Sequence, residues 1–350
     1  MSTIRVGIVG LGENTRTRHV PGLLACDDVE IAAVVNRRPE STAAAAKQFD
    51  IPRTFERWED LVADPDLDAI VIGTWPYLHC PITVAALDAG KHVLTEARMA
   101  MNADEAYRML AASRRHPDLV AQIVPSPIAF LVDPTVKRMV AEGYLGDLRE
   151  VAVIGAFDEL ADADAPYHWR QSKQFSGLNA LFMGIVHEAL IRWVPDPVTV
   201  MAQTQIFTHE RIDPDTGKKE QVGTPDSVQI LTQLPGGARG IYHISNAIRF
   251  GPPLQIHLYG SEGTIKYLSA PDQHLVAGRK GDGDLQRVDI PEKDQYAWRV
   301  EEEFVDAIRG RGTIEFTDFE TGVRYMEFTE AVARSAESGH AVAMPLGGSH

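Results

Sequence analysis

The chain has 350 residues, 44 % of them hydrophobic and 24 % charged, which is typical of a globular protein with room for two domains. Its formal net charge of −15 argues against nucleic acid and anionic membranes as partners, because no basic stripe offsets the acidic groups. Two cysteines, Cys26 and Cys80, form no disulfide framework, and no apolar run approaches membrane-spanning length, so we expect a cytoplasmic protein without a signal peptide.

Strand and helix patterns alternate through the first third of the chain. The expected strands are 5–9, 31–36, 69–73, 92–95 and 120–124, and the expected helices are 19–25, 40–49, 58–63, 81–89 and 103–115. One helix separates each strand from the next, which favours right-handed βαβ crossovers. We therefore predict a doubly wound parallel sheet of the Rossmann type in a first domain, residues 1–126.

A glycine turn follows the first of these strands. Gly10 permits a tight turn, and Gly12 lets the backbone come close to a pyrophosphate. The helix that follows the turn would point its amides and the positive end of its dipole at that anion, and Asn14 and Thr15 of the turn are further candidates for contact with the cofactor. Thr15 stands where the third glycine or alanine of the fingerprint usually allows close packing of helix on strand. The pattern predicts that the first domain binds a dinucleotide.

The end of the second strand bears on which dinucleotide binds. NAD sites usually place Asp or Glu there to accept the ribose hydroxyls. This strand ends instead in Asn36-Arg37-Arg38, so no carboxylate repels a 2′-phosphate and two guanidiniums are placed to hold one. We predict NADP, with NAD as the alternative cofactor. The competing interpretation is a solvated pair of arginines that opens the next helix.

Strands without intervening helices dominate after about residue 127. A helix is expected at 133–142, a strand at 148–156 and an apolar helix at 179–193, while residues 158–176 have no assignment. Strands follow at 198–207, 227–234, 238–247, 255–259 and 264–268, then helices at 298–309 and 320–338 and a loose Gly-rich tail. Pro235-Gly236-Gly237 indicates a hairpin. The pattern predicts a second domain, residues 127–350, of α+β class with a largely antiparallel open sheet.

Short motifs run through both expected domains. The first domain contains TWPYLH at 74–79 and AALDAGKHVLTE at 85–96. The second contains Trp169-Arg170 before Ser176-Gly177, then YGSEGT at 259–264 and FVDAIR at 304–309. In order and spacing these motifs resemble the signatures of the Gfo/Idh/MocA family of nicotinamide-dependent oxidoreductases.

This resemblance implies an oxidoreductase acting on a sugar, polyol or related small carbonyl compound. It implies a cofactor bound by the first domain, with the nicotinamide near Trp75, Pro76 and Glu96, and with Thr74 and His79 in the same loop. It also implies a homo-oligomer, a dimer or tetramer, assembled through the sheet of the second domain.

The chain departs from the family pattern where chemistry is expected. The family's lysine, in an E-K-P motif, corresponds to Ala97, and the proline corresponds to Arg98. The aspartate and histidine of its D-x-G-x-H helix correspond to Phe182 and Val186, with His187 one residue further on.

Two groups are candidates for proton transfer. His187 is the first, because imidazole titrates near neutrality, although the apolar residues around it favour a core histidine equally well. Tyr167 is the second, with His168 and Arg170 beside it as substrate-binding residues. His168, His187 and Glu188 lack the spacing of a metal site, and we expect no metal.

Arg98 follows a strand at the carboxyl edge of the sheet, where ligands bind in doubly wound folds. A guanidinium cannot act as a base at neutral pH, but it can hold a carboxylate, a phosphate or an oxyanion. An ordinary ion pair is the alternative for Arg98. Tyr77 and His79 lie at the same edge; Tyr77 is a candidate for substrate binding, and His79 can instead orient the loop.

Two other functions remain open at this point. A bound cofactor could oxidise and re-reduce a sugar during elimination or hydrolysis, without net redox. Alternatively, the chain could be a catalytically silent protein that senses or binds the cofactor.

Overall fold

The computed structural model describes residues 3–347 and divides the chain into two compact units. Unit 1 is the chain up to Pro125 together with Arg299–Met326, and unit 2 is Ser126–Trp298 together with the chain from Glu327 onward. The division differs from two continuous domains, 1–126 and 127–350, because a late segment returns to unit 1. That segment contains α9 (Val300–Ile308), whose buried Phe304 and Val305 belong to an apolar face that sequence alone cannot assign to either unit.

Unit 1 contains a six-stranded parallel sheet in the order β3-β2-β1-β4-β5-β6. The strands are β1 Ile4–Val9, β2 Val29–Val35, β3 Arg53–Thr54, β4 Ala69–Ile72, β5 His92–Thr95 and β6 Ala121–Ile123. All four residues of β4 are buried, because helices cover both faces of a doubly wound sheet. The predicted Rossmann-type sheet is confirmed, with β3 as an additional short edge strand.

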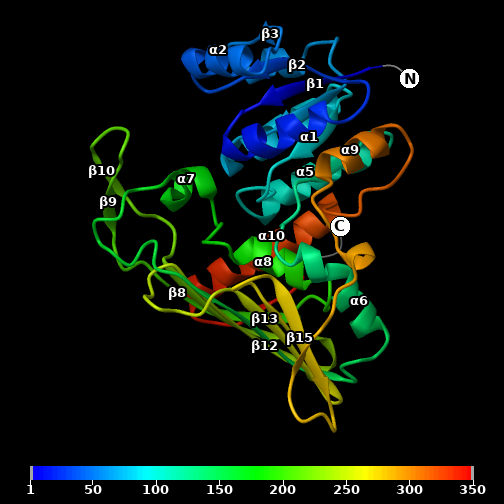
Figure 1. Ribbon diagram of the computed structural model, residues 1–350. Helices are drawn as coiled ribbons and strands as arrows, with labels where there is room; N and C mark the ends of the chain where they lie inside the picture. The colour runs from blue at the N-terminus through cyan, green and yellow to red at the C-terminus, as the bar shows by residue number, and fades with distance from the viewer. Residues whose placement is uncertain (1–2, 348–350) are drawn as a thin grey trace. The chain divides into compact units, whose positions relative to one another are not determined.

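Helices of unit 1 connect these strands (Figure 1). They are η1 Thr15–His19, α1 Val20–Leu24, α2 Pro39–Gln48, α3 Trp58–Val62, η2 Pro76–Leu78, α4 His79–Asp88 and α5 Ala103–Arg115. In α5, Asn102 caps the N-terminus by accepting the amide of Glu105, and Ala106 and Met109 face the core. The first predicted helix, 19–25, actually begins earlier, in the π-helical turn η1.

Unit 2 contains a nine-stranded sheet in the order β16-β15-β14-β13-β7-β12-β11-β8-β17. Its strands are β7 Leu148–Ala156, β8 Thr199–Gln205, β11 Ser227–Gln233, β12 Arg239–Ser245, β13 Gln255–Gly260, β14 Gly263–Leu268, β15 His274–Arg279, β16 Gln286–Arg287 and β17 Val342–Ala343. Only the β12–β7 pair is parallel among these described strands, so the largely antiparallel sheet is confirmed. A separate hairpin pairs β9 Glu210–Ile212 with β10 Lys219–Gln221.

The expected loose tail is ordered for part of its length. β17 pairs with β8 and so adds an edge strand to the sheet. The last residues of that expected tail, 348–350, lie outside the part of the chain that the structure describes.

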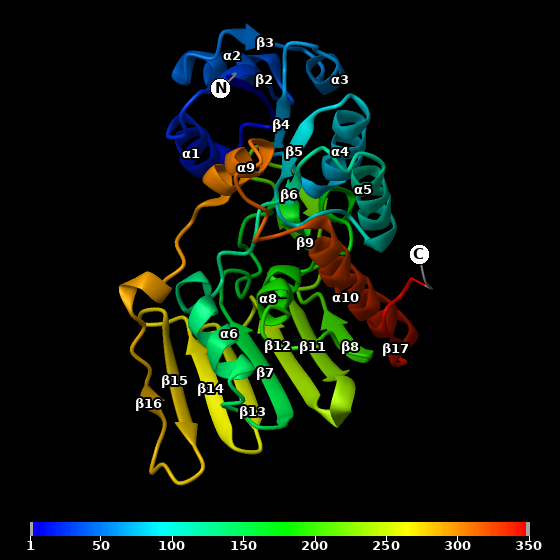
Figure 2. The ribbon, with the colours of Figure 1, turned by 90° about the vertical axis from the view of Figure 1, so that its right-hand side faces the viewer.

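Helices cover one face of the unit 2 sheet (Figure 2). They are α6 Asp133–Ala141, α8 Met183–Leu190 and the C-terminal part of α10 Phe319–Ser338. Unit 2 also contains the short helix α7 Lys173–Ser176 and the turns η3 Phe130–Val132, η4 Trp169–Gln171, η5 Pro235–Gly237 and η6 Glu292–Asp294. The helix expected at 179–193 is shorter, because Leu181 has a φ of 48° and this left-handed backbone cannot continue a helix. Within residues 3–347, none of the helices is long and apolar enough to cross a bilayer.

A buried ion pair fastens the start of unit 2 to α8. Arg192 Nη2 donates to Glu188 Oε1 at 2.6 Å, and Glu188 Oε2 accepts the amide of Ser126 at 2.6 Å. Arg192 also donates to the carbonyl of Ser126 at 2.8 Å and lies over the ring of Phe130. This network confirms the helical i, i+4 pairing of the two charges and gives both a structural role.

Candidate functional site

A cavity of about 540 Å³ opens in unit 1 at the carboxyl ends of the parallel strands. Its walls come from the turn after β1, the end of β2, the loop before α3 and the turn after β4. The lining residues are Val9, Gly10, Leu11, Gly12, Val35, Asn36, Arg37, Ser41, Glu56, Arg57, Trp58, Glu59, Gly73, Thr74, Trp75, Tyr77 and Leu78. Most of the residues predicted to bind the cofactor line this cavity, and Tyr77, predicted for the substrate, lines it too.

Three glycines, Gly10, Gly12 and Gly73, line this cavity. Gly10 has a φ of 86°, and a Cβ there would lie 2.8 Å from the amide nitrogen of Thr74. A Cβ on Gly73 would collide with the Thr15 hydroxyl, which itself donates to the carbonyl of Gly10 at 3.3 Å. Thr15 therefore fits where the fingerprint usually has a glycine, because Gly73, after the facing strand β4, has no side chain and leaves room for the Thr15 hydroxyl.

Asn36 organises the wall at the end of β2. Its Oδ1 accepts the amide of Leu11 at 2.6 Å, and its Nδ2 donates to the carbonyl of Ser41 at 3.1 Å. Arg37 is exposed, lines the cavity and lies 6.0 Å from the centre of the Trp75 ring. Arg38 is exposed and precedes α2, and it does not belong to the lining.

Ser41 and Arg57 belong to the same wall and were missed by the sequence analysis. Ser41 lies in α2, and Arg57 precedes α3. Sequence motifs gave no signal for either residue, because only the sheet order brings these two helix starts to the end of β2.

A buried cluster of charges lies beside the glycine turn. His19, which is 0 % exposed, donates from Nε2 to Glu96 Oε1 at 3.0 Å and from Nδ1 to Glu301 Oε1 at 2.5 Å. Asn14 Nδ2 donates to the same oxygen of Glu96. A neutral imidazole has one N–H, so the two carboxylate contacts require the protonated ring. The predicted cofactor residues Asn14 and Glu96 thus meet in a cluster whose other members, His19 and Glu301, the sequence analysis did not single out.

The surroundings of His19 stabilise its charged form. Burial alone would lower the pKa of His19, but hydrogen bonds and attraction from Glu301 and Glu96 raise that pKa from 6.5 to about 9. Burial opposes ionisation of Glu96 as well, yet the hydrogen bond and charge of His19 hold the pKa of Glu96 below its usual range. The cluster therefore carries one cation between two acids at neutral pH.

His79 connects the loops after β4 and β5. Its Nδ1 lies 2.8 Å from the carbonyl oxygen of Arg98, and its Nε2 lies 2.9 Å from that of Thr74. The ring is fully buried, and this burial lowers the pKa of His79. These two contacts join the loop after β4 to Arg98, which follows Glu96 and Ala97 after β5. The Arg98 side chain is largely buried.

The polar candidates of unit 2 lie together on one turn. His168 caps η4 by accepting the amide of Arg170 at 3.2 Å, and the Arg170 guanidinium lies 4.6 Å from the Trp169 ring centre. The amide of Tyr167 donates to the carbonyl of Ile212 at 2.8 Å. Burial raises the pKa of the half-buried Tyr167, although a hydrogen bond with Ser172 opposes the shift.

Arg211 braces the segment that leads to this turn, and its role was not predicted. It is buried and donates to the carbonyls of Asp162 at 2.8 Å, Ala165 at 3.1 Å and Leu160 at 2.9 Å. Carbonyls in a helix or strand accept hydrogen bonds from the main chain. Here the Arg211 guanidinium donates to three of them instead, so residues 158–168 can hold their conformation without regular secondary structure.

His187 lies in the core of unit 2. It is 1 % exposed, its Nδ1 is 2.8 Å from the Tyr242 hydroxyl, and its ring stacks on Phe328 at 3.6 Å. Val186 is fully buried, and Phe182 packs edge-on against Phe157. Phe182, Val186 and His187 therefore contribute to packing under the sheet.

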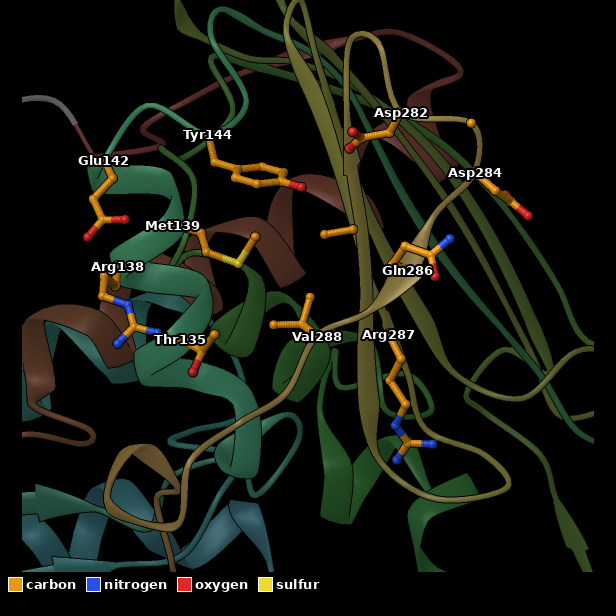
Figure 3. Close-up of a pocket in the computed structure, with 12 residues that line it drawn as sticks. Thr135, Arg138, Met139, Glu142, Tyr144, Asp282, Asp284, Gln286, Arg287 and Val288 are labelled. Carbon is orange, nitrogen blue, oxygen red and sulfur yellow. The ribbon is translucent and has the colours of Figure 1, made fainter.

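A second cavity, of about 550 Å³, lies in unit 2 between α6 and the strands β15 and β16 (Figure 3). Met139, Tyr144 and Val288 line it together with charged residues such as Arg138, Glu142 and Arg287. None of the predicted site residues lines it. Within residues 3–347, no group of three or more His, Cys, Asp or Glu side chains is arranged to hold a metal.

Comparisons with known proteins match both units. The model of the Gfo/Idh/MocA oxidoreductase family with an NAD-binding Rossmann fold matches residues 4–123, and the model of the Gfo/Idh/MocA C-terminal domain matches residues 134–266. An uncharacterised oxidoreductase, ORF334 of Rhizobium meliloti, is 25 % identical over 97 % of this chain and 99 % of its own. Mouse (Mus musculus) trans-1,2-dihydrobenzene-1,2-diol dehydrogenase is 28 % identical over 79 % of each chain.

Solved structures share the fold. The apo form of levoglucosan dehydrogenase has a TM-score of 0.87 at 21 % identity, covering 99 % of this chain and 100 % of that chain. The complex of levoglucosan dehydrogenase with NADH and L-sorbose has a TM-score of 0.85 at 22 % identity, covering 98 % of this chain and 99 % of that chain.

The charge cluster predicts how the stability of unit 1 depends on pH. The pKa of His19 is about 9 in the folded unit and 6.5, its ordinary value, in the unfolded chain, so folding favours the protonated ring. Its contribution, roughly 3 to 4 kcal/mol at about 1.4 kcal/mol per pKa unit, is complete below pH 6.5 and is lost as the pH rises through about 9. Urea unfolding across this range should show that loss in the wild type and not in His19→Gln. Parallel curves for the two proteins would contradict the assignment.

Proposed function

The chain belongs to the Gfo/Idh/MocA family of oxidoreductases, and from that premise we propose that it is an NADP-preferring enzyme that transfers hydride to or from a sugar, polyol or related small carbonyl compound. The observation that carries the proposal is the glycine-floored cavity of unit 1, which holds most of the residues that the sequence assigned to a dinucleotide.

The residues of this cavity fit a dinucleotide. The absence of side chains at Gly10 and Gly73 leaves room for close backbone approach. The hydroxyl of Thr74 is buried without a hydrogen-bond partner in the described part of the chain, at a point where a ligand could supply one. A nicotinamide cofactor, when bound, supplies or accepts the hydride.

The wall at the end of β2 supports NADP over NAD. Asn36 stands at the position of the acid that accepts ribose hydroxyls, and both ends of its amide are already hydrogen-bonded to the protein. Arg37 and Ser41 line the same wall and offer a guanidinium and a hydroxyl to a 2′-phosphate, and Arg57, which pairs with Glu59 at 3.4 Å, adds a second guanidinium to that wall.

Relatives support a carbohydrate-like or diol substrate. Similar proteins include a levoglucosan dehydrogenase and several trans-1,2-dihydrobenzene-1,2-diol dehydrogenases. Arg98 would hold a polar or anionic part of such a substrate, because its guanidinium follows Glu96 at the sheet edge.

Proton transfer is assigned to Tyr167 rather than to His187. Tyr167 is half-buried, and its raised pKa keeps the phenol protonated at neutral pH, so it can donate to a carbonyl oxygen. His187 is enclosed by Tyr242 and Phe328, and it could exchange a proton with substrate only if the core opened. His168 and Arg170, on the same turn as Tyr167, would contact polar groups of the substrate.

A homo-oligomer is the assembly that the sheet of unit 2 supports. Met201, Leu231 and Ile241 are paired in register on β8, β11 and β12 and are 44 %, 59 % and 49 % exposed. They form an apolar row on the face opposite α8, where water would otherwise meet three large side chains. Both cysteines are free, which supports the cytoplasm as the compartment.

A substrate panel tests the reaction. Incubation with NADP⁺ and a set of sugars and polyols should give NADPH absorbance with at least one compound. Tyr167→Phe should lower kcat by about two orders of magnitude, the usual size of general acid–base catalysis, while NADPH binding stays unchanged. Product without an absorbance change would instead indicate redox-neutral chemistry, and tight binding without turnover of any compound would indicate a sensor.

Arg37→Asp tests the cofactor preference. Loss of a guanidinium–phosphate contact should weaken NADPH binding by roughly ten- to a hundredfold and leave NADH binding nearly unchanged. Arg38→Asp introduces the same charge one residue away, outside the cavity lining, and should have the smaller effect. Calorimetry that shows tighter NADH than NADPH binding by the wild type would refute the preference.

Leu231→Glu tests the assembly. A carboxylate in the middle of the apolar row should shift the protein to a smaller species in light scattering coupled to size exclusion. Leu24→Glu is the matched control, since Leu24 is a 56 % exposed leucine of unit 1. A wild type that is monomeric at all concentrations would refute the proposal.

A further inference from the structure

We propose that His19 is a positioning residue whose protonation is coupled to cofactor binding: as a cation between Glu96 and Glu301, it holds the phosphate-binding turn in place and removes a negative charge beside it. The proposal rests on the proposed function, because it requires a dinucleotide in the cavity of unit 1.

Glu96 ties both ends of the turn to the sheet. One oxygen, Oε1, accepts from Asn14 Nδ2 and from His19 Nε2. Asn14 follows Gly12 by two residues, and His19 ends the π-helical turn η1, in which Val20 donates its amide to the carbonyl of Thr15. The carboxylate at the end of β5 therefore sets the orientation of the backbone that would face the pyrophosphate.

Glu301 holds the other side of the imidazole. It reaches His19 from α9, and a Cβ on Gly22 would lie 2.8 Å from Cδ and Cγ of Glu301. Gly22 thus gives the acid room to approach the buried ring. π-helical turns are rare and concentrate at functional sites, and this one presents the ring to both acids.

The charge of the cluster depends on the ring. With His19 protonated, the two acids and the imidazolium sum to one negative charge; without that proton, they sum to two. A pyrophosphate bound by the adjacent turn is itself anionic, so loss of the proton adds repulsion and also withdraws one hydrogen bond from a carboxylate. Because coupling between sites is reciprocal, the bound cofactor should in turn favour the protonated ring.

Other titratable groups lie near the acids. His79 interacts with Glu96, and burial lowers the pKa of His79, whereas hydrogen bonds to the carbonyls of Thr74 and Arg98 oppose that shift. Cys26 interacts with Glu301, and burial raises the pKa of its thiol above 9.0. Cys26→Ser therefore separates any contribution of the thiol from that of His19.

The test is the pH profile of NADPH affinity, measured by fluorescence titration of the full chain. Wild type should bind about tenfold more weakly at about pH 10 than at about pH 7, because the ring loses its proton over this range. Glu301→Gln removes one acid, lowers the proton affinity of the ring and should move the loss of binding about one pH unit or more toward neutral.

Two controls keep the readout specific. Glu302→Gln alters the neighbouring, exposed acid of α9, which pairs with Arg299, and should keep the wild-type profile. Cys26→Ser should keep it as well. If Glu301→Gln does not fold, NMR titration of the His19 ring in wild type replaces it, with a higher pKa expected when NADPH is bound.

Three outcomes would overturn the proposal. They are a flat wild-type profile, coincident profiles for wild type and Glu301→Gln, and an NMR pKa of His19 that NADPH does not change. Absence of any NADPH or NADH binding by wild type at neutral pH would refute the proposed function itself, so the two failures are distinguishable.

Discussion

A cation enclosed between two buried carboxylates holds together the functional end of unit 1. His19, Glu96 and Glu301 come from η1, the end of β5 and α9, and the ring and Glu301 are 282 residues apart in sequence. Removal of the His19 cation would leave two buried carboxylates without a compensating charge, so the contact among the three elements depends on the protonated ring. This requirement helps to explain why Arg299–Met326 returns to a unit that otherwise ends at Pro125.

Close packing constrains the glycine turn after β1. Thr15 and Gly73 exchange the roles usual for a dinucleotide fingerprint, since the side chain sits on the helix and the glycine on the facing strand end. The total volume at the contact is what close packing constrains, and the residue that supplies it is free to change. A missing fingerprint glycine therefore does not by itself argue against a nucleotide fold.

Helix α8 of unit 2 is a packing element. Phe182 and Val186 contribute to the core beneath the sheet, and the His187 ring lies 2.8 Å from the Tyr242 hydroxyl and stacks on Phe328. Polar side chains of the predicted site concentrate instead on the turn of Tyr167 and Arg170, which Arg211 braces from behind. Chemistry in this chain is thus expected to come from an irregular segment supported by a rigid sheet.

The sequence by itself determined both sheets, most helices and the glycine turn of the unit 1 cavity, because period, turn chemistry and glycine placement act over short distances. It left His187 open between core and site, and it gave no signal for Glu301, Ser41, Arg57 or β17. These features depend on contacts between segments that are distant in sequence. The tertiary structure buries the His187 side chain in the core of unit 2, and the strand order of unit 1 brings Ser41 and Arg57 to the cavity. Only the tertiary structure decided which acid meets His19, because the pairing of buried charges is set by packing and not by spacing along the chain.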